Sequence, residues 1–143
     1  MRIGAKVGRL LGGVIILVGG AACSSGTAPE ERPTEARIEV LGSAPSPLEL
    51  VTVTEFFESV EEGEVVQIPI VSDTLAVTPP FERTVALTDL GSIVVELTNY
   101  EEEPATVELR VRLDNGADPY SGSATMSEGG SLRYVFVFLR RLL

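Results

Sequence analysis

Apolar and polar side chains alternate most regularly between residues 107 and 114. Four apolar and four charged residues follow one another there, in the order Val107, Glu108, Leu109, Arg110, Val111, Arg112, Leu113 and Asp114. A period of two puts the apolar residues on one face of a β-strand and the charged residues on the other. Asn115-Gly116 comes next, and this pair favours a tight hairpin turn because both positions tolerate positive φ. The pattern predicts a strand with one buried face, followed by a hairpin.

Other apolar runs, separated by turn residues, predict further strands. Threonine and valine dominate residues 48–57, and β-branched residues favour a strand over a helix. Pro69 indicates an edge strand or a bulge, because proline cannot donate to a β-ladder. Residues 132–139 are apolar on both faces apart from Arg133, which predicts a central or sandwiched strand. The expected strands are residues 37–41, 48–57, 64–71, 84–88, 92–99, 107–113, 120–126 and 132–139.

These runs define the fold class that we expect. No helical periodicity of useful length follows residue 23. Seven to eight strands within residues 36–143 can bury one core without disulfides. We therefore predict an all-β domain, an immunoglobulin-like antiparallel β-sandwich, with a closed barrel as the alternative.

The first 22 residues have the pattern of a lipoprotein signal peptide. Basic residues precede an apolar stretch at 10–18, and small residues at 19–22 lead directly to Cys23. We expect a signal helix at residues 1–22, cleavage between Ala22 and Cys23, and lipidation of Cys23. The uncharged stretch 10–22 is shorter than the roughly 20 apolar residues that span a bilayer. Gly20 departs from the usual signal, which leaves the cleavage enzyme open. Secretion with a free Cys23 and an uncleaved membrane anchor are the alternatives.

Composition changes abruptly after the signal. Residues 23–35 are rich in Ser, Thr, Pro and Glu, which predicts a disordered polar tether before the domain at 36–143. All 21 acidic residues follow the signal, but only eight of the 11 basic residues do, so the mature chain carries a net charge of −13. Such a surface repels nucleic acid. Contact with the membrane is expected through the N-terminal lipid, at the extracytoplasmic side of the cell envelope.

The inventory of reactive side chains is small. There is no histidine, and Cys23 is the sole cysteine, which excludes Ser-His-Asp and Cys-His catalysis and zinc sites built from imidazole or thiolate. We expect no enzyme activity, no catalytic residues, no cofactor and no metal. Residues 114–118 could offer oxygen ligands to calcium, but a hairpin turn explains them equally well. Two acidic clusters are interpreted as solvated loops, with contact with a basic partner as the alternative, namely Glu58, Glu61, Glu62 and Glu64, and Glu101, Glu102 and Glu103.

Several short motifs resemble the extracytoplasmic domain of the MmpS family, accessory proteins of mycobacterial MmpL lipid exporters. They are Val40-Leu41-Gly42, the Thr/Val-rich residues 50–56, Val66-Gln67-Ile68-Pro69-Ile70, and Val111 to Gly116 with residues 121–125. The sequence departs from the family at Ile70, where the family has tryptophan, and in lacking its cysteine pair and membrane helix. The resemblance implies a non-enzymatic sandwich that supports a transporter or moves lipid.

Taken together, these patterns favour a lipid-anchored, non-catalytic binding or accessory module that contacts another envelope protein or a transporter. Two alternatives remain. The apolar surplus at residues 132–139 could line a cavity for a hydrophobic or lipid ligand. The protein could also be a purely structural envelope lipoprotein.

Overall fold

Eight β-strands make up the structure, a computed structural model that describes residues 31–140. The expected signal helix at 1–22, its cleavage site and Cys23 lie outside the described residues. The strands are β1 (Glu35–Ser43), β2 (Leu48–Glu61), β3 (Glu64–Val77), β4 (Phe81–Ala86), β5 (Ile93–Thr98), β6 (Ala105–Leu113), β7 (Tyr120–Met126) and β8 (Ser131–Phe136).

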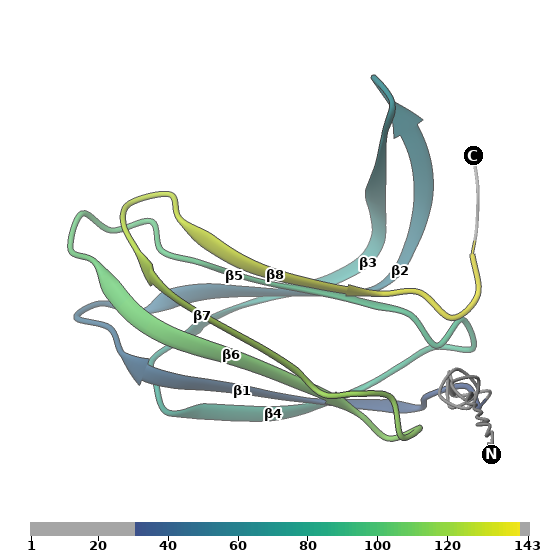
Figure 1. Ribbon diagram of the computed structural model, residues 1–143, viewed down its shortest axis with the longest axis horizontal. Helices are drawn as coiled ribbons and strands as arrows, with labels where there is room; N and C mark the ends of the chain where they lie inside the picture. The colour runs from purple at the N-terminus through teal and green to yellow at the C-terminus, as the bar shows by residue number, and fades with distance from the viewer. Residues whose placement is uncertain (1–30, 141–143) are drawn as a thin grey trace, which may run out of the picture.

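The strands form two four-stranded antiparallel sheets that pack face to face (Figure 1). The first sheet has the order β4-β1-β6-β7, and the second has the order β3-β2-β5-β8. Hairpins join β2 to β3 and β6 to β7 within a sheet, whereas the other connections cross between the sheets. The predicted antiparallel β-sandwich is confirmed, and the two separate sheets distinguish it from a closed barrel.

The core lies between the sheets and follows the period-two pattern. On β6 the apolar residues at 105, 107, 109, 111 and 113 are each at most 4% exposed, as the alternation predicts. Ile38 on β1 and Leu50 and Leu97 on β2 and β5 are at most 1% exposed. Burying aliphatic side chains from both sheets in one cluster is the main stabilising contribution of the fold.

Strand β8 differs from the prediction. It ends at Phe136 and lies at the edge of its sheet, paired only with β5, so the expectation of a central strand was wrong. Its inward residues, Leu132, Tyr134 and Phe136, pack against the core. Arg133 and Val135 point outward, and Val135 is 38% exposed. The apolar residues past 136 belong to the C-terminal segment rather than to the strand.

Residues 31–35 of the expected tether are attached to the domain. Pro33 is buried, and β1 already begins at Glu35. The Asp114 carboxylate accepts hydrogen bonds from Thr34 N at 2.8 Å, Thr34 Oγ1 at 2.5 Å and Glu35 N at 3.1 Å. Asn115 Nδ2 donates to the carbonyl oxygen of Glu31 at 2.9 Å. The connection between β6 and β7, residues 114–119, is therefore longer than the tight turn expected, and it holds the incoming chain in place.

The β2–β3 hairpin extends beyond the sandwich. Both strands have 14 residues, but β5 pairs with β2 only from Glu49 to Val53. The β2–β3 register shifts between Val53 and Glu55 and again between Glu55 and Phe56, and such a bulge bends a strand pair. Beyond the bulge the hairpin rises away from the body (Figure 1). We call residues 55–71 the arm. Pro69 lies on the edge strand beside this bulge, as the sequence indicated.

Candidate interaction surface

The arm has one face that continues the outer surface of the second sheet. Directly opposed residues of a strand pair project from the same side, so this face is defined by three cross-strand pairs. They are Phe56 with Pro69, Glu58 with Gln67, and Val60 with Val65. We call it the inner face of the arm, because its side chains contact the body of the protein at its base and middle.

The base of the inner face is apolar and packed. Phe56 is 4% exposed and clusters with Val53 and Val94, which are 6% and 4% exposed, and with Val137 of the C-terminal segment. Val53 and Val94 are register partners on β2 and β5. Since a two-stranded hairpin alone is marginal in water, this small second cluster stabilises the root of the arm.

The middle of the inner face is polar and closely covered. Gln67 Oε1 accepts a hydrogen bond from Arg133 Nη2 at 3.0 Å, which links β3 to β8. Glu58 is 4% exposed, and its Oε2 lies 3.4 Å from Nη1 of Arg140, whose side chain is 63% exposed. Oε1 of Glu58 is buried without a hydrogen-bond partner. The interpretation of Glu58 as a solvated loop residue was therefore wrong, because the extended β2 carries it under the C-terminal segment.

The tip of the arm exposes aliphatic side chains to water. Val60 and Val65 on the inner face are 71% and 52% exposed. Ile68, Ile70 and Val71 further along β3 are 36%, 45% and 47% exposed. Ile68 is the register partner of Phe57 and projects from the opposite face of the arm, so the exposed apolar pair of the inner face is Val60 with Val65. Covering this pair would contribute roughly 25 cal/mol for each Å² of apolar surface removed from water.

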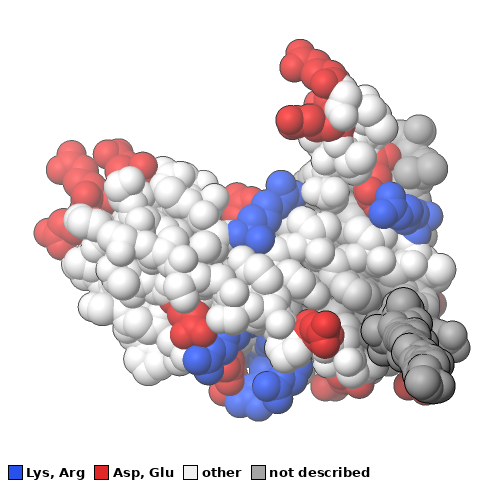
Figure 2. All heavy atoms as spheres, in the orientation of Figure 1, with Lys and Arg blue, Asp and Glu red and all other residues white. Residues whose placement is uncertain are grey.

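Acidic residues are exposed in two places, beside the valines at the turn of the arm and in a distant loop. Glu61, Glu62 and Glu64 form the turn of the arm and are exposed, as predicted. Glu101, Glu102 and Glu103, also exposed, connect β5 to β6. Figure 2 shows acidic groups at the tip of the arm and at the opposite end of the body, with a notch between them. A shallow pocket of about 120 Å³ lies at the base of the arm, lined by Val51, Val53, Gln67, Pro69, Val94, Glu96 and Arg133.

Residues 31–140 contain seven arginines and 20 acidic residues, so the described part of the chain has a net charge of −13. The arm follows this bias, because its only ionisable side chains are glutamates. Chemically, the inner face offers an apolar contact area, Val60 and Val65, bordered by the glutamates of the turn.

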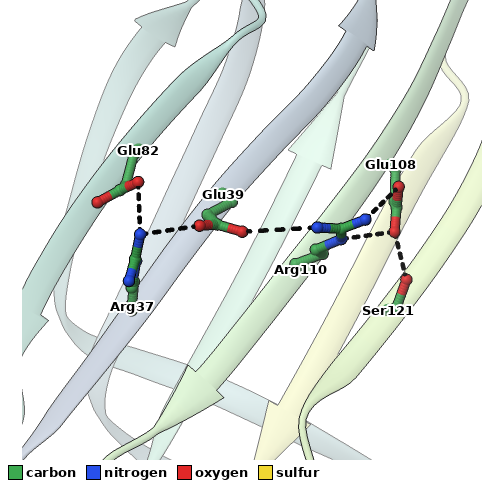
Figure 3. Close-up of polar contacts among 6 residues, drawn as sticks. All are labelled: Arg37, Glu39, Glu82, Glu108, Arg110 and Ser121. Atoms are coloured by element: carbon green, nitrogen blue, oxygen red, sulfur yellow. Dashed lines mark hydrogen bonds and ion pairs between the residues drawn. The ribbon is translucent and has the colours of Figure 1, made fainter.

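The outer face of the first sheet carries a second polar arrangement, a charged ladder across four strands (Figure 3). Arg37 contacts Glu82 at 2.8 Å and Glu39 at 3.1 Å, and Arg110 contacts Glu108 at 2.7 Å and Glu39 at 4.0 Å. The hydrogen bond from Arg110, helped by one from Ser121 at 2.7 Å, lowers the pKa of the Glu108 carboxyl. A pocket of about 330 Å³ lies beside the ladder, lined in part by Arg37, Arg110, Arg112 and Tyr120.

The ladder is nearly balanced in charge. Three carboxylates alternate with two guanidinium groups, and Arg112 lies opposite Arg37 in the β1–β6 register. Among the arginines of residues 31–140, Arg112 has no carboxylate within ion-pair distance, and its charge offsets the excess carboxylate. We therefore interpret the ladder as a device that fixes strand register rather than as a binding site.

The acidic loop 114–118, which the sequence analysis considered for calcium, contacts the entering chain. Asp114 binds the entering chain through its two oxygens, and residues 31–140 contain no group of three or more acidic side chains placed to hold a metal ion. The acidic loop 114–118 therefore acts as a clasp for residues 34 and 35. No helix that could cross a membrane occurs within the described residues. Ala22 and Cys23 lie outside them.

Sequence reasoning missed that Val60 and Val65 form an exposed cross-strand pair on a projecting hairpin. One signal could have found them, since the two valines stand at equal distances from the turn at Glu62-Gly63 and must face each other across it. No protein-family model matches the chain, and comparisons with curated proteins and with solved structures find no significant match. The resemblance to the MmpS family therefore stays a prediction.

Proposed function

We propose that this protein is a non-catalytic binding module of the bacterial envelope, lipid-anchored at Cys23, which holds another envelope protein with its arm. One observation supports this function above all. The arm leaves the sandwich and presents Val60 and Val65 to solvent at 71% and 52% exposure. A fold that served only to bury its own apolar residues would gain nothing from such a projection.

The placement of the chain ends supports an action close to a membrane. The described chain enters the sandwich at the same end from which the arm rises (Figure 1). Glu31 comes eight positions after Cys23, and a fully extended chain of that length reaches at most about 30 Å. A lipid on Cys23 would keep the point where the chain enters the domain within about 30 Å of the bilayer surface. The partner is then a protein in or on the same membrane, and the MmpS resemblance makes a lipid exporter one form of it.

The hydrophobic-carrier alternative has less support. It was motivated by apolar residues on both faces at 132–139, but Leu132, Tyr134 and Phe136 pack against the core cluster between the sheets. The outward-facing Val135 and the nearby Val137 belong to the surface of the second sheet and the base of the arm. Leu132, Tyr134 and Phe136 therefore belong to a packed core rather than to the lining of a cavity.

Site-specific photo-crosslinking in cells tests the proposed function. A photoreactive amino acid replaces Val60 or Val65 in the full chain, and the matched control places it at Tyr100, which is 59% exposed. We expect one discrete crosslinked product from the arm positions and none from position 100. Equal labelling from the arm and from position 100, or no product from the arm, would argue against a binding role. Intact-mass analysis of the same purified protein tests the anchor, with a diacylated Cys23 as the expected N-terminus.

A further inference from the structure

The middle of the arm's inner face contains a buried carboxylate, Glu58, whose hydrogen bonding is incomplete. Glu58 is 4% exposed, and one of its two carboxylate oxygens has no hydrogen-bond partner. A buried carboxylate oxygen without a donor costs free energy, and the other contact, 3.4 Å from Arg140 Nη1, is longer than the roughly 2.7–2.9 Å of a good charge-assisted hydrogen bond. Glu58 is thus buried with only one long contact to a cation.

The residues on either side of Glu58 indicate what kind of partner surface would supply the missing hydrogen-bond donor. Val60 and Val65 extend the inner face toward the tip, and Phe56 and Pro69 extend it toward the base. A single carboxylate–amide pair, Glu58 with Gln67, therefore lies between two apolar pairs. The acidic turn of Glu61, Glu62 and Glu64 adds further negative charge at the tip. A complementary surface is apolar with one basic side chain at its centre.

We propose that the partner bound by the arm presents an apolar segment carrying an arginine or lysine, whose charged group donates to Glu58. This inference rests on the proposed function and names the chemistry of the partner. Arg140, 63% exposed and weakly held, occupies the position in the free protein and is displaced when the partner binds. The C-terminal segment thereby acts as a replaceable cover for the carboxylate.

The negative charge of the arm favours a basic protein segment as its partner over a second copy of the chain or an anionic bilayer. A second copy of the chain would bring its own net charge of −13 against the acidic tip. The three glutamates of the turn would also repel a bilayer with anionic headgroups. At contact the charges lie closer together than the screening length of about 8 Å in physiological salt, so the repulsion is not screened. Strand addition to the open edge of β3 is hindered at Pro69, which lacks a backbone donor.

The experiment uses the full mature chain and three synthetic peptides with blocked ends. Each peptide has 12 residues of alternating valine and serine, with arginine, glutamine or glutamate at the centre. Binding is measured by fluorescence anisotropy, and the contact is mapped from the methyl NMR signals of Val60 and Val65. The variants are Glu58→Gln and Arg140→Gln, with Glu102→Gln as a matched control on the distant acidic loop.

We expect the arginine peptide to bind about tenfold more tightly than the glutamate peptide and to shift the signals of Val60 and Val65. Glu58→Gln should weaken that binding about tenfold, whereas Arg140→Gln should strengthen it severalfold because it removes the competing cation. Glu102→Gln should leave it within about twofold. If the pair of Glu58 and Arg140 only stabilised the fold, the two substitutions would not change peptide affinity in opposite directions.

Several results would overturn the inference. They are equal binding of the arginine and glutamate peptides, no binding at the arm, unchanged affinity in Glu58→Gln, or weakening by Arg140→Gln equal to that by Glu58→Gln. A concentration-dependent dimer that covers the arm, or binding to phosphatidylglycerol vesicles through Val60, would assign the surface to another occupant. If photo-crosslinks form at Val60 while the peptides do not discriminate, the proposed function stands and this inference fails. If neither occurs, both fail.

Discussion

Val60 and Val65 lie directly opposite each other across the arm, each next to the acidic turn, and both side chains are more than half exposed. Cross-strand apolar pairs usually stabilise a sheet by excluding water between them. At this position the pair remains exposed to solvent. Its contribution to folding is small, and its apolar area is available to a partner.

Replacing both valines with threonine should therefore leave stability nearly unchanged. Threonine keeps the β-branched shape and strand preference, and little buried area is lost. We expect the free energy of unfolding of Val60→Thr/Val65→Thr to stay within about 0.5 kcal/mol of the parent in urea titrations. A loss above about 1.5 kcal/mol would mean that the two side chains are packed in solution, which is incompatible with their role as an open surface.

Phe56 should behave in the opposite way. Its ring is 4% exposed and joins Val53 and Val94 at the root of the arm. Phe56→Ala leaves a cavity at the edge of the body, and we expect a loss of about 2–3 kcal/mol, below the usual range for a central core site. Urea unfolding measures it, and Tyr100→Ala, at a residue 59% exposed, is the matched control with little expected change. Amide hydrogen exchange in residues 55–71 should accelerate, and unchanged exchange would show that the ring does not hold the arm.

The Asp114 clasp predicts an acid-sensitive contribution to stability. The hydrogen bond from the Thr34 hydroxyl is the main cause of the lowered pKa of Asp114, opposed by desolvation and assisted by the backbone N–H groups of Thr34 and Glu35. A carboxyl with a lowered folded pKa stabilises the fold fully above its ordinary pKa. This stabilisation is lost as the pH falls through the lowered value.

We expect Asp114→Ala to lose about 1–2 kcal/mol at pH 7, since the site is exposed and three hydrogen bonds disappear. The difference from the parent should vanish at a pH below the folded pKa of Asp114. Unfolding measured across the acid range checks this, with Asp118→Ala in the same loop as the control. A difference that persists at the lowest pH would assign the effect to something other than the ionised carboxylate.

The charged ladder gives a prediction that is local rather than global. Arg110 is the largest cause of the lowered pKa of Glu108, through a hydrogen bond of 2.7 Å. Arg110→Gln should raise the pKa of the Glu108 carboxyl toward its ordinary value, although the hydrogen bond from Ser121 remains. NMR titration of the side-chain carboxyl carbon follows this directly. If the titration of Glu108 does not change, the two side chains are not paired in solution.

Much of the sandwich could be predicted from the sequence because strands such as β1 and β6 have one buried face. Residues 107–113 show this best, since their period of two encodes both the strand and the side facing the core. The position of β8 could not be predicted in the same way. From the sequence, Val135 is expected to be a core residue. In the fold it lies on the outer face of the sheet opposite Val94, beside the apolar cluster at the base of the arm, and only the folded chain brings these residues together.

The arm itself was only partly predictable. Pro69 indicated an edge or a bulge, and both are present, but the bend depends on where β5 stops pairing with β2, at Val53. Local sequence does not contain that limit. For the same reason the sequence predicted Glu58 to be one more solvated glutamate, whereas it is buried and contacts Arg140, 82 residues further along the chain. Long-range contacts of this kind leave no periodic pattern.

The most direct test of the proposed role compares the reactivity of the arm in the envelope and in isolation. Cysteine replaces Val60 in one variant and Tyr100 in another, and the rate of maleimide labelling at each position is measured by mass spectrometry in intact envelopes and in the purified protein. The account predicts fast labelling at both positions in the purified protein, and slow labelling at position 60 alone in envelopes. Equal rates at position 60 in both preparations would contradict it, because an arm that binds a partner cannot stay equally open.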